Sequence, residues 1–226
     1  MNPYGYALPA ARASLGDRVG FLRRVYGLFF ASLLMAGVGA VAGLEPSVLR
    51  VTMAHPLLCW GGEMGLIFAC MAMRRRAGIN MVLLFAFTFV SGVVLTPMLV
   101  LATLRTGGFA VVAQAFATTC LVFGGLSIYT LVTKQDFSWM RGFVVTALFA
   151  LIGVALLNAF FFHSGAVQMA MSAAGVLVFS CWVLFDTSRI LRSTPVDDAV
   201  GAALSLYLDF INLFLSILQL MSGRRR

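Results

Sequence analysis

The chain has 226 residues, of which 61% are hydrophobic and 11% charged, with a mean hydropathy of +0.98 and a formal net charge of +8. Soluble domains contain about 25% charged residues, so this composition excludes a soluble domain and indicates an integral membrane protein. The basic residues lie in short gaps between apolar runs and form no long polar face, so no nucleic-acid partner is expected.

Seven apolar runs are long enough to cross a membrane, whose hydrocarbon core of about 30 Å needs about 20 helical residues. They span residues 25–43, 55–73, 79–101, 109–132, 141–162, 165–189 and 200–222. The expected fold is therefore an all-α bundle of seven transmembrane helices. Residues 1–24 are predicted to form an amino-terminal segment, residues 25–222 the transmembrane domain, and residues 223–226 a basic tail.

The loop charges predict the orientation. Eleven Lys and Arg side chains fall on the side of the amino terminus and five on the other, which predicts a cytoplasmic amino terminus. Seven spans place the basic tail outside, whereas a six-span alternative, in which the last segment dips back, returns it to the cytoplasm. Seven spans are favoured because residues 200–222 are long enough to cross. No cleaved signal peptide is expected, because the small residues of LPAARASL precede the first apolar run.

Several residue types are assigned no chemistry. The four cysteines, Cys59, Cys70, Cys120 and Cys181, stand alone within apolar runs and are predicted to be free buried thiols. No zinc site or other cofactor is expected, and without H-E-x-x-H or G-x-S-x-G motifs the chain is not expected to be an enzyme. Gly39-x-x-x-Gly43 and Gly124-Gly125 are interpreted as helix-packing signals.

Polar residues of the last span form a stripe along one helical face. Their spacings of 4, 3, 4 and 3 confine them to an arc of about 80°, which must face the protein interior or a water-filled path. The stripe consists of Ser205, Asp209, Asn212, Ser216 and Gln219. The sixth span has a sparser stripe of Gln168, Ser172, Gly175 and Asp186.

Asp186 and Asp209 lie on the inward faces of consecutive helices, at depths that differ by about 7 to 8 Å. Two carboxylates in a poorly solvated site share a proton and titrate as a unit, so the pair is predicted to sense pH. Carboxylates are also hard oxygen ligands, which makes the pair a candidate calcium site. Two alternatives remain: a structural hydrogen bond for Asp209, and a solvated position at a helix end for Asp186.

The second span carries two further charged residues on one face, about 16 Å apart along the helix. Arg74 lies at the cytoplasmic end and is a candidate counter-ion for the aspartate pair. Glu63 lies nearer the membrane midplane with no obvious partner, as expected of a residue that lines an ion path. The alternative for Arg74–Arg76 is a simple orientation signal. Ser205, Asn212 and Ser216 are assigned to the same ion path, with packing hydrogen bonds as their alternative.

The segments VFSCWVLFDTSRILRS and ALSLYLDFINLFLSILQLM resemble the last two helices of the transmembrane Bax inhibitor motif family, also called the Bax inhibitor 1 family. DRVGFLRRVYGLFFASLL, GGEMGLIFACMAMRRR and TTCLVFGGLSIYTLVTKQDFSWMRGF resemble its first, second and fourth helices. The resemblance implies a seven-helix bundle with the last helix central, and a calcium leak gated by pH. By motif, Asp186 and Asp209 match the family's di-aspartyl sensor, Arg74 its latch, and Glu63 its second-helix glutamate.

One position departs from the family. Many relatives carry arginine where this chain has Gln219, so their salt bridge from the second-helix glutamate to the last helix is not carried over. Two functions are weighed: a pH-sensitive calcium leak, and a non-conducting regulator that binds a membrane-embedded ATP-dependent protease. The resemblance favours the leak, with the lipid bilayer and calcium ions as partners and a bacterial inner membrane as location.

Overall fold

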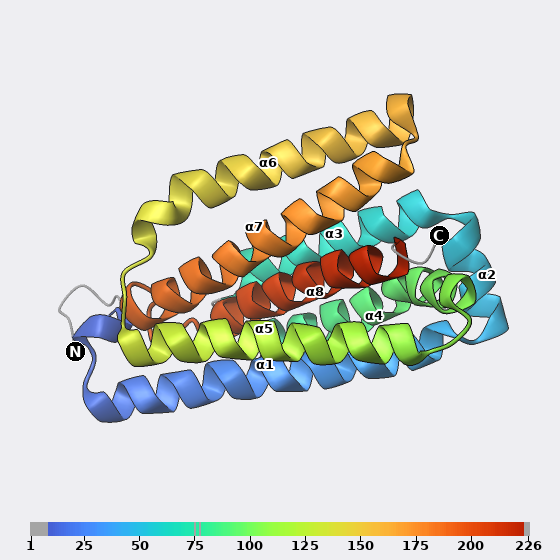
Figure 1. Cartoon of the computed structure of the whole chain (residues 1–226). Coiled ribbons are helices and arrows are strands. Elements are labelled where there is room, and N and C mark those ends of the chain that lie inside the picture. The colour runs from blue at the N-terminus through green and yellow to red at the C-terminus, as the bar shows by residue number, and fades with distance from the viewer. Residues whose placement is uncertain (1–8, 75, 77, 224–226) are drawn as a thin grey trace. The chain divides into compact units, whose positions relative to one another are not determined.

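The computed structural model describes residues 9–74, 76 and 78–223 (Figure 1). Residues 1–8 of the amino-terminal segment, Arg75 and the tail residues Arg224–Arg226 lie outside the described part. The elements in chain order are η1 (Ala10–Arg12), α1 (Leu15–Gly43), α2 (Pro46–Ala54), α3 (Pro56–Met73), α4 (Ile79–Thr106), α5 (Ala110–Thr133), η2 (Ser138–Met140), α6 (Arg141–Leu157), the π-helical η3 (Asn158–Phe162), α7 (Gly165–Arg192) and α8 (Ala199–Gly223).

The prediction of seven apolar helices is confirmed. Seven helical segments are long and apolar enough to cross a membrane, namely Leu15–Gly43, Pro56–Met73, Ile79–Thr106, Ala110–Thr133, Ser138–Phe162, Gly165–Arg192 and Ala199–Gly223. The fifth combines η2, α6 and η3. Among the described residues the only β feature is an isolated bridge between Pro9 and Pro195. The all-α fold class is therefore confirmed.

The last helix is the most enclosed. In the most apolar 18-residue stretch of α8, 67% of the residues are buried. The corresponding share in the other six spans is 6% to 33%. No residue between Ala199 and Gly223 is fully exposed. This burial agrees with the expected central position of the last helix.

The first helix begins earlier than predicted, at Leu15 instead of residue 25. Ser14 caps it: its hydroxyl oxygen accepts a hydrogen bond from the Asp17 backbone N–H at 3.2 Å, and Asp17 places a negative charge in the first turn. Both features stabilise a helix amino terminus. The hydropathy pattern missed this extension because it carries charged residues, which do not interrupt a helix but do end an apolar run.

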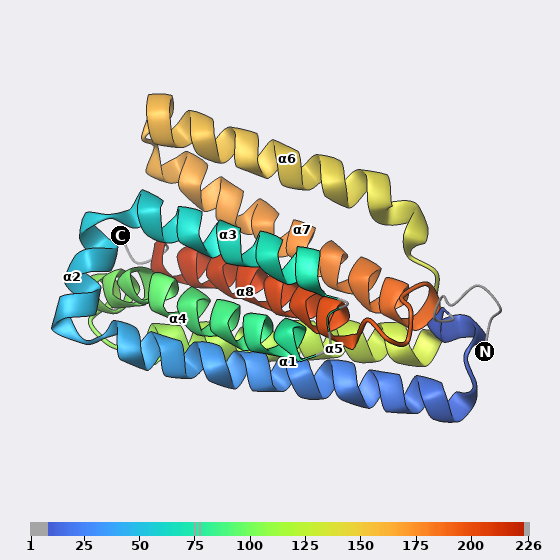
Figure 2. The same ribbon diagram turned by 180° about the vertical axis from the view of Figure 1, so that it is seen from behind.

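The described chain forms two compact units. The first comprises η1, α1 to α3, α4 up to Leu101, and α8 up to Tyr207. The second comprises the end of α4, α5 to α7 up to Leu191, and α8 from Leu208. In the first unit α1 and α4 are in backbone contact (Figure 2). Gly39 faces the Phe89 carbonyl and Gly43 faces Thr96, so this packing prediction is confirmed.

The packing contact predicted for Gly124-Gly125 is not present. A Cβ atom added at Gly124 or Gly125 would meet nothing within 4 Å. Neither glycine therefore permits a close helix contact, and the prediction for this pair is wrong. Glycine spacing alone does not distinguish the face of a helix that packs from the one that faces lipid.

A short helix between the first two long ones, α2, was not predicted. Its amino terminus is capped by Glu45, whose Oε2 accepts hydrogen bonds from the backbone N–H groups of Ser47 at 2.8 Å and Val48 at 3.2 Å. The Ser47 hydroxyl also donates to this oxygen. The hydrogen bonds from the Ser47 side chain, the Ser47 backbone and the Val48 backbone hold the pKa of Glu45 below its usual value.

This cap predicts a pH-dependent stability of α2. A lowered pKa means that ionised Glu45 stabilises the helix at neutral pH, and that this contribution is lost as pH falls through the lowered pKa. We expect Glu45→Ala to accelerate amide hydrogen exchange in α2 at pH 7. The difference between Glu45→Ala and the parent protein should vanish in acid. An equal difference at both pH values would contradict a charge-dependent cap.

Candidate functional site

Asp186 and Asp209 lie in the same unit, on α7 and α8. Their exposed fractions are 3% and 6%, so the alternative of a solvated helix-end position for Asp186 is excluded. The charged groups that interact electrostatically with Asp209 are Asp186 and Arg189. The two aspartates that the sequence analysis singled out are therefore brought within electrostatic reach of each other.

Arg189 is the positive charge at this site, and the sequence analysis missed it. Its Nη2 atom lies 3.3 Å from each carboxylate oxygen of Asp186. The guanidinium carbon stands 5.8 Å from the centre of the Phe185 ring, within cation–π range. The signal was present in the sequence, because residues three apart on a helix are neighbours.

The alternative role for Asp209 was a structural hydrogen bond. Within the described residues its Oδ2 atom is buried and has no hydrogen-bond partner. A carboxylate kept for structure is expected to use its buried oxygens, since an unsatisfied buried acceptor costs about 1 to 3 kcal/mol. The buried Oδ2 atom therefore gives no support to a structural hydrogen bond as the role of Asp209.

Two carboxylates and one guanidinium define a simple charge balance. The site carries a net charge of −1 when both acids are ionised and is neutral when one is protonated. A single proton therefore decides whether the site attracts a cation. Among the described residues no group of three or more His, Cys, Asp or Glu side chains forms a metal cluster. Calcium takes six to eight oxygen ligands, more than two carboxylates supply. The pair therefore suits transient contact with a permeating ion better than stable calcium binding.

Arg74 lies in the first unit and has an acidic partner there. It ends α3, and its Nη1 atom is 3.6 Å from Oδ2 of Asp198. The other carboxylate oxygen of Asp198 accepts a hydrogen bond from the Gly201 N–H at 3.1 Å and so caps α8. The Arg74 side chain is 49% exposed, so the pair contributes at most about 1 kcal/mol. Its predicted contact with Asp186 and Asp209 would join two units and stays a prediction.

Glu63 was expected to have no obvious partner, and the structure places polar groups of two other helices near it. It is half-buried on α3, and the Ser91 side chain of α4 lies close to it. Tyr207, fully buried in the first half of α8, lies near Ser91 and Glu63, although its hydroxyl has no hydrogen-bond partner among the described residues. The Phe87 ring packs edge-on against Tyr207 at 5.7 Å. The sequence pattern could not reveal this cluster, because its members come from three helices.

The remaining stripe residues on α8 form mostly local hydrogen bonds. Asn212 donates its side-chain amide to the Leu208 carbonyl at 2.8 Å, and Ser216 donates its hydroxyl to the Asn212 carbonyl at 2.8 Å. Both bonds lie within α8, so they do not join it to another helix. Ser205, half-buried in the first unit, also has a partner. Their assignment to an ion path stays a prediction.

Gln219, the position that departs from the family, joins α8 to α7. Gln168 donates its side-chain amide to the Gln219 side-chain carbonyl at 2.7 Å. The Ser172 hydroxyl lies 3.1 Å from the same oxygen. One turn away, Gly175 faces Ser216 so closely that a Cβ would collide with it. The predicted polar stripe of the sixth span thus packs against the stripe of the seventh.

All four cysteines are free thiols, as expected. Only Cys70 is buried, however, whereas Cys59 and Cys181 are half-buried and Cys120 is exposed. The prediction of buried thiols is wrong for Cys120, because a position in an apolar helix can face lipid as well as protein.

Comparison with known proteins gives one family and several relatives. The family described as inhibitor of apoptosis-promoting Bax1 matches residues 18–226. A Campylobacter jejuni protein named only as uncharacterized is 40% identical over 206 residues, which cover 89% of this chain and 87% of that protein. An uncharacterized membrane protein of Vibrio cholerae is 35% identical, covering 88% and 87%. The Golgi anti-apoptotic protein of vaccinia virus is 33% identical over 224 residues, covering 97% and 92%.

Proposed function

The chain belongs to the Bax inhibitor 1 family of membrane proteins, and we propose that it is a pH-sensitive calcium leak gated by Asp186 and Asp209. The observation that carries the proposal is the buried acid pair with one arginine beside it. Protonation of one carboxylate neutralises the site, and loss of that proton restores a charge that attracts a cation. No covalent chemistry is involved, so we propose no enzymatic role.

The location proposed is a bacterial inner membrane with the amino terminus in the cytoplasm. The excess of Lys and Arg on the amino-terminal side supports this orientation, and the bacterial relatives support the membrane. In this orientation the aspartate pair lies toward the cytoplasmic end of α7. The proton that gates the leak would then come from the cytoplasm.

Calcium flux tests the proposal. Purified protein in proteoliposomes is expected to admit calcium at a rate that depends on pH when the pH is varied from about 5 to about 8, because two acids that share a proton titrate as a unit. Absence of flux above that of empty vesicles at every pH, from protein shown to be folded, would exclude the leak.

A non-conducting regulator of a membrane-embedded ATP-dependent protease is the second candidate. In this hypothesis the amino-terminal segment carries the contact; its Ala10 N–H donates to the Thr194 carbonyl of the loop before α8 at 3.0 Å. A deletion of residues 2–8 spares this anchor. If the regulator hypothesis holds, the deletion abolishes capture of the protease, whereas a leak retains its calcium flux.

Arg189 is expected to tune the pH dependence. Arg189 contributes the positive charge in the charge balance of the site, with its Nη2 atom 3.3 Å from Asp186. Arg189→Gln should therefore shift the pH midpoint of flux, and Arg189→Lys, which keeps the charge, should largely retain it. An unchanged midpoint in Arg189→Gln together with a shifted one in Arg74→Gln would instead favour Arg74 as the latch.

A further inference from the structure

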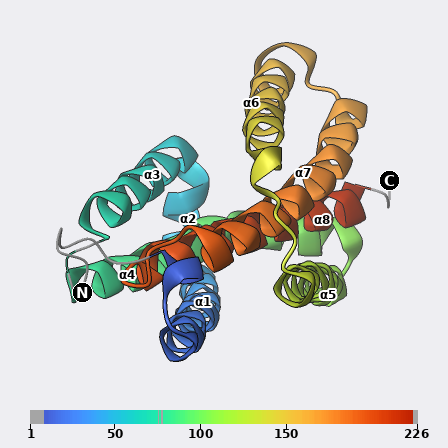
Figure 3. The same ribbon diagram turned by 90° about the vertical axis from the view of Figure 1, so that its left-hand side faces the viewer.

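The pair α6 and α7 is held together at both ends and open in between. At one end Met140, Val144 and Phe185 form a buried apolar cluster. At the other end Asn158 accepts hydrogen bonds from the Ser164 N–H to its side chain at 3.0 Å and from the His163 N–H to its carbonyl at 2.8 Å. The result is a helical hairpin (Figure 3) whose separation is set by two fixed anchors.

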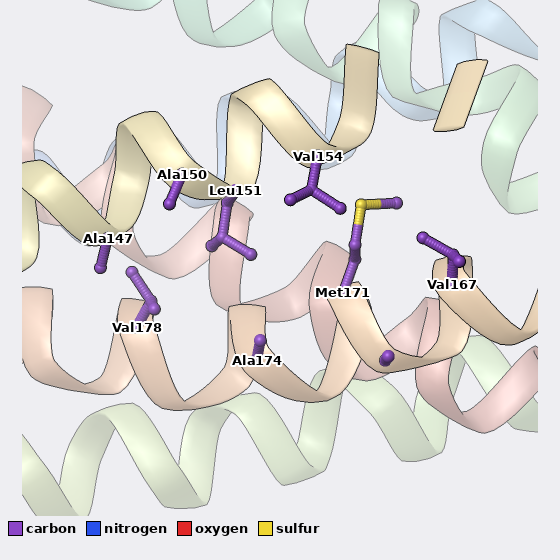
Figure 4. A pocket seen from close by; sticks show the side chains of 9 residues that line it. Ala147, Ala150, Leu151, Val154, Val167, Met171, Ala174 and Val178 are labelled. Carbon is purple, nitrogen blue, oxygen red and sulfur yellow. The ribbon is translucent and has the colours of Figure 1, made fainter. Parts of the chain in front are cut away.

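A groove of about 410 Å³ lies between these anchors. Figure 4 shows side chains of both helices pointing into it. Every residue that lines it is apolar, and many are small, including Ala147, Ala150 and Val154 of α6 and Val167, Ala174 and Val178 of α7. The groove therefore offers no hydrogen bond to a polar ligand, an ion or water, and apolar cavities of this kind bind apolar molecules.

The dimensions of the groove match one leaflet of a membrane. On α7 it extends from Val167 to Val178, which corresponds to about 16 Å along the helix. Half of a hydrocarbon core of about 30 Å is about 15 Å. The groove occupies the half of α7 next to the α6–α7 turn, so it begins at one face of the membrane and ends near the midplane.

We propose that this groove binds a single acyl chain of a membrane lipid, in the leaflet next to the α6–α7 turn. The site is independent of calcium conduction. Both walls are parts of membrane-spanning helices, so acyl chains are the apolar molecules that surround them. The small alanines leave room for a chain that the two helices, fixed at both ends, cannot fill by moving together.

A helix of a second protein fits the groove poorly. The groove extends over only about 16 Å of α7, from Val167 to Val178. A partner helix needs the full membrane depth of about 30 Å. An acyl chain is narrow and one leaflet deep, and therefore matches the length of the groove.

Photo-crosslinking in lipid vesicles tests the proposal. The probe is a phosphatidylcholine with a diazirine in the middle of one acyl chain, and labelled peptides are identified by mass spectrometry. We expect labelling to concentrate on residues 147–154 and 167–178. Ala174→Trp fills the groove from α7 and should reduce this labelling several-fold. Ala150→Leu fills it from α6 and provides a second, milder test.

Two control variants place the same side chains outside the groove. Ala173→Trp and Ala155→Leu lie at exposed positions of α7 and α6 and should leave the labelling unchanged, with circular dichroism confirming that all four variants fold. Equal labelling in the filled and control variants would overturn the proposal. A change of oligomeric state in Ala174→Trp without a change in labelling would also overturn it, because the groove would then be a protein interface.

Discussion

Replacing Asp209 by asparagine is expected to flatten the pH dependence of calcium flux through proteoliposomes. Asparagine has nearly the same shape as aspartate but cannot take up or release a proton. The charged fraction of a single acid falls about tenfold per pH unit below its midpoint and is nearly constant above it, so flux through the parent protein should change several-fold where the range crosses the midpoint. Flux through the variant should change little, because Asp186 alone faces the positive charge of Arg189 at 3.3 Å.

The matched control for this experiment is Asp197→Asn. Asp197 is an exposed residue of the loop before α8, so its replacement removes the same charge without touching the buried pair. This variant should retain the parental pH profile. A full pH dependence in folded Asp209→Asn would show that the pair is not the sensor. Flattening in both variants would point to surface charge as the cause.

The sequence carried most of the information on the spans and on the two acids. Apolar runs of about 20 residues have few structural solutions in a membrane, which is why the predicted boundaries of α3, α7 and α8 agree with the structure within about three residues. An acidic side chain inside such a run is unfavourable in the bilayer, and such residues are therefore rare and easily recognised in the sequence. The sequence therefore identifies Asp186 and Asp209 without knowledge of their contacts.

The partners of the charged residues were less accessible from the sequence. Arg74 was paired with the aspartates because of its depth and a family resemblance, whereas the structure gives it Asp198, a residue of the loop that precedes α8. Glu63 lies near Ser91 of α4 and Tyr207 of α8. Depth along a helix follows from counting residues, but rotation and tilt are set by packing against neighbouring helices. Which polar groups meet therefore depends on contacts that a linear pattern does not contain.

The contact between α1 and α4 is one such case, and it leads to a second large expected effect. Gly39 of α1 faces the Phe89 carbonyl, and Gly92 of α4 faces the Ala36 carbonyl. The Thr96 hydroxyl lies 3.1 Å from the Ala40 carbonyl across the same contact. Small residues allow helix backbones to approach closely in a membrane, where packing and interhelical hydrogen bonds drive association.

Gly92→Ala is expected to destabilise the first unit, because the new methyl group would overlap a backbone carbonyl that cannot rotate away. Overpacking of this kind costs about 1 to 3 kcal/mol, and separating the helices would also weaken the Thr96 contact. The loss should appear as a lower Tm in detergent. Gly37→Ala, at an exposed position of α1 with nothing within 4 Å, should be neutral or stabilising by up to about 1 kcal/mol. A Tm for Gly92→Ala equal to that of Gly37→Ala would mean that α1 and α4 are not in backbone contact.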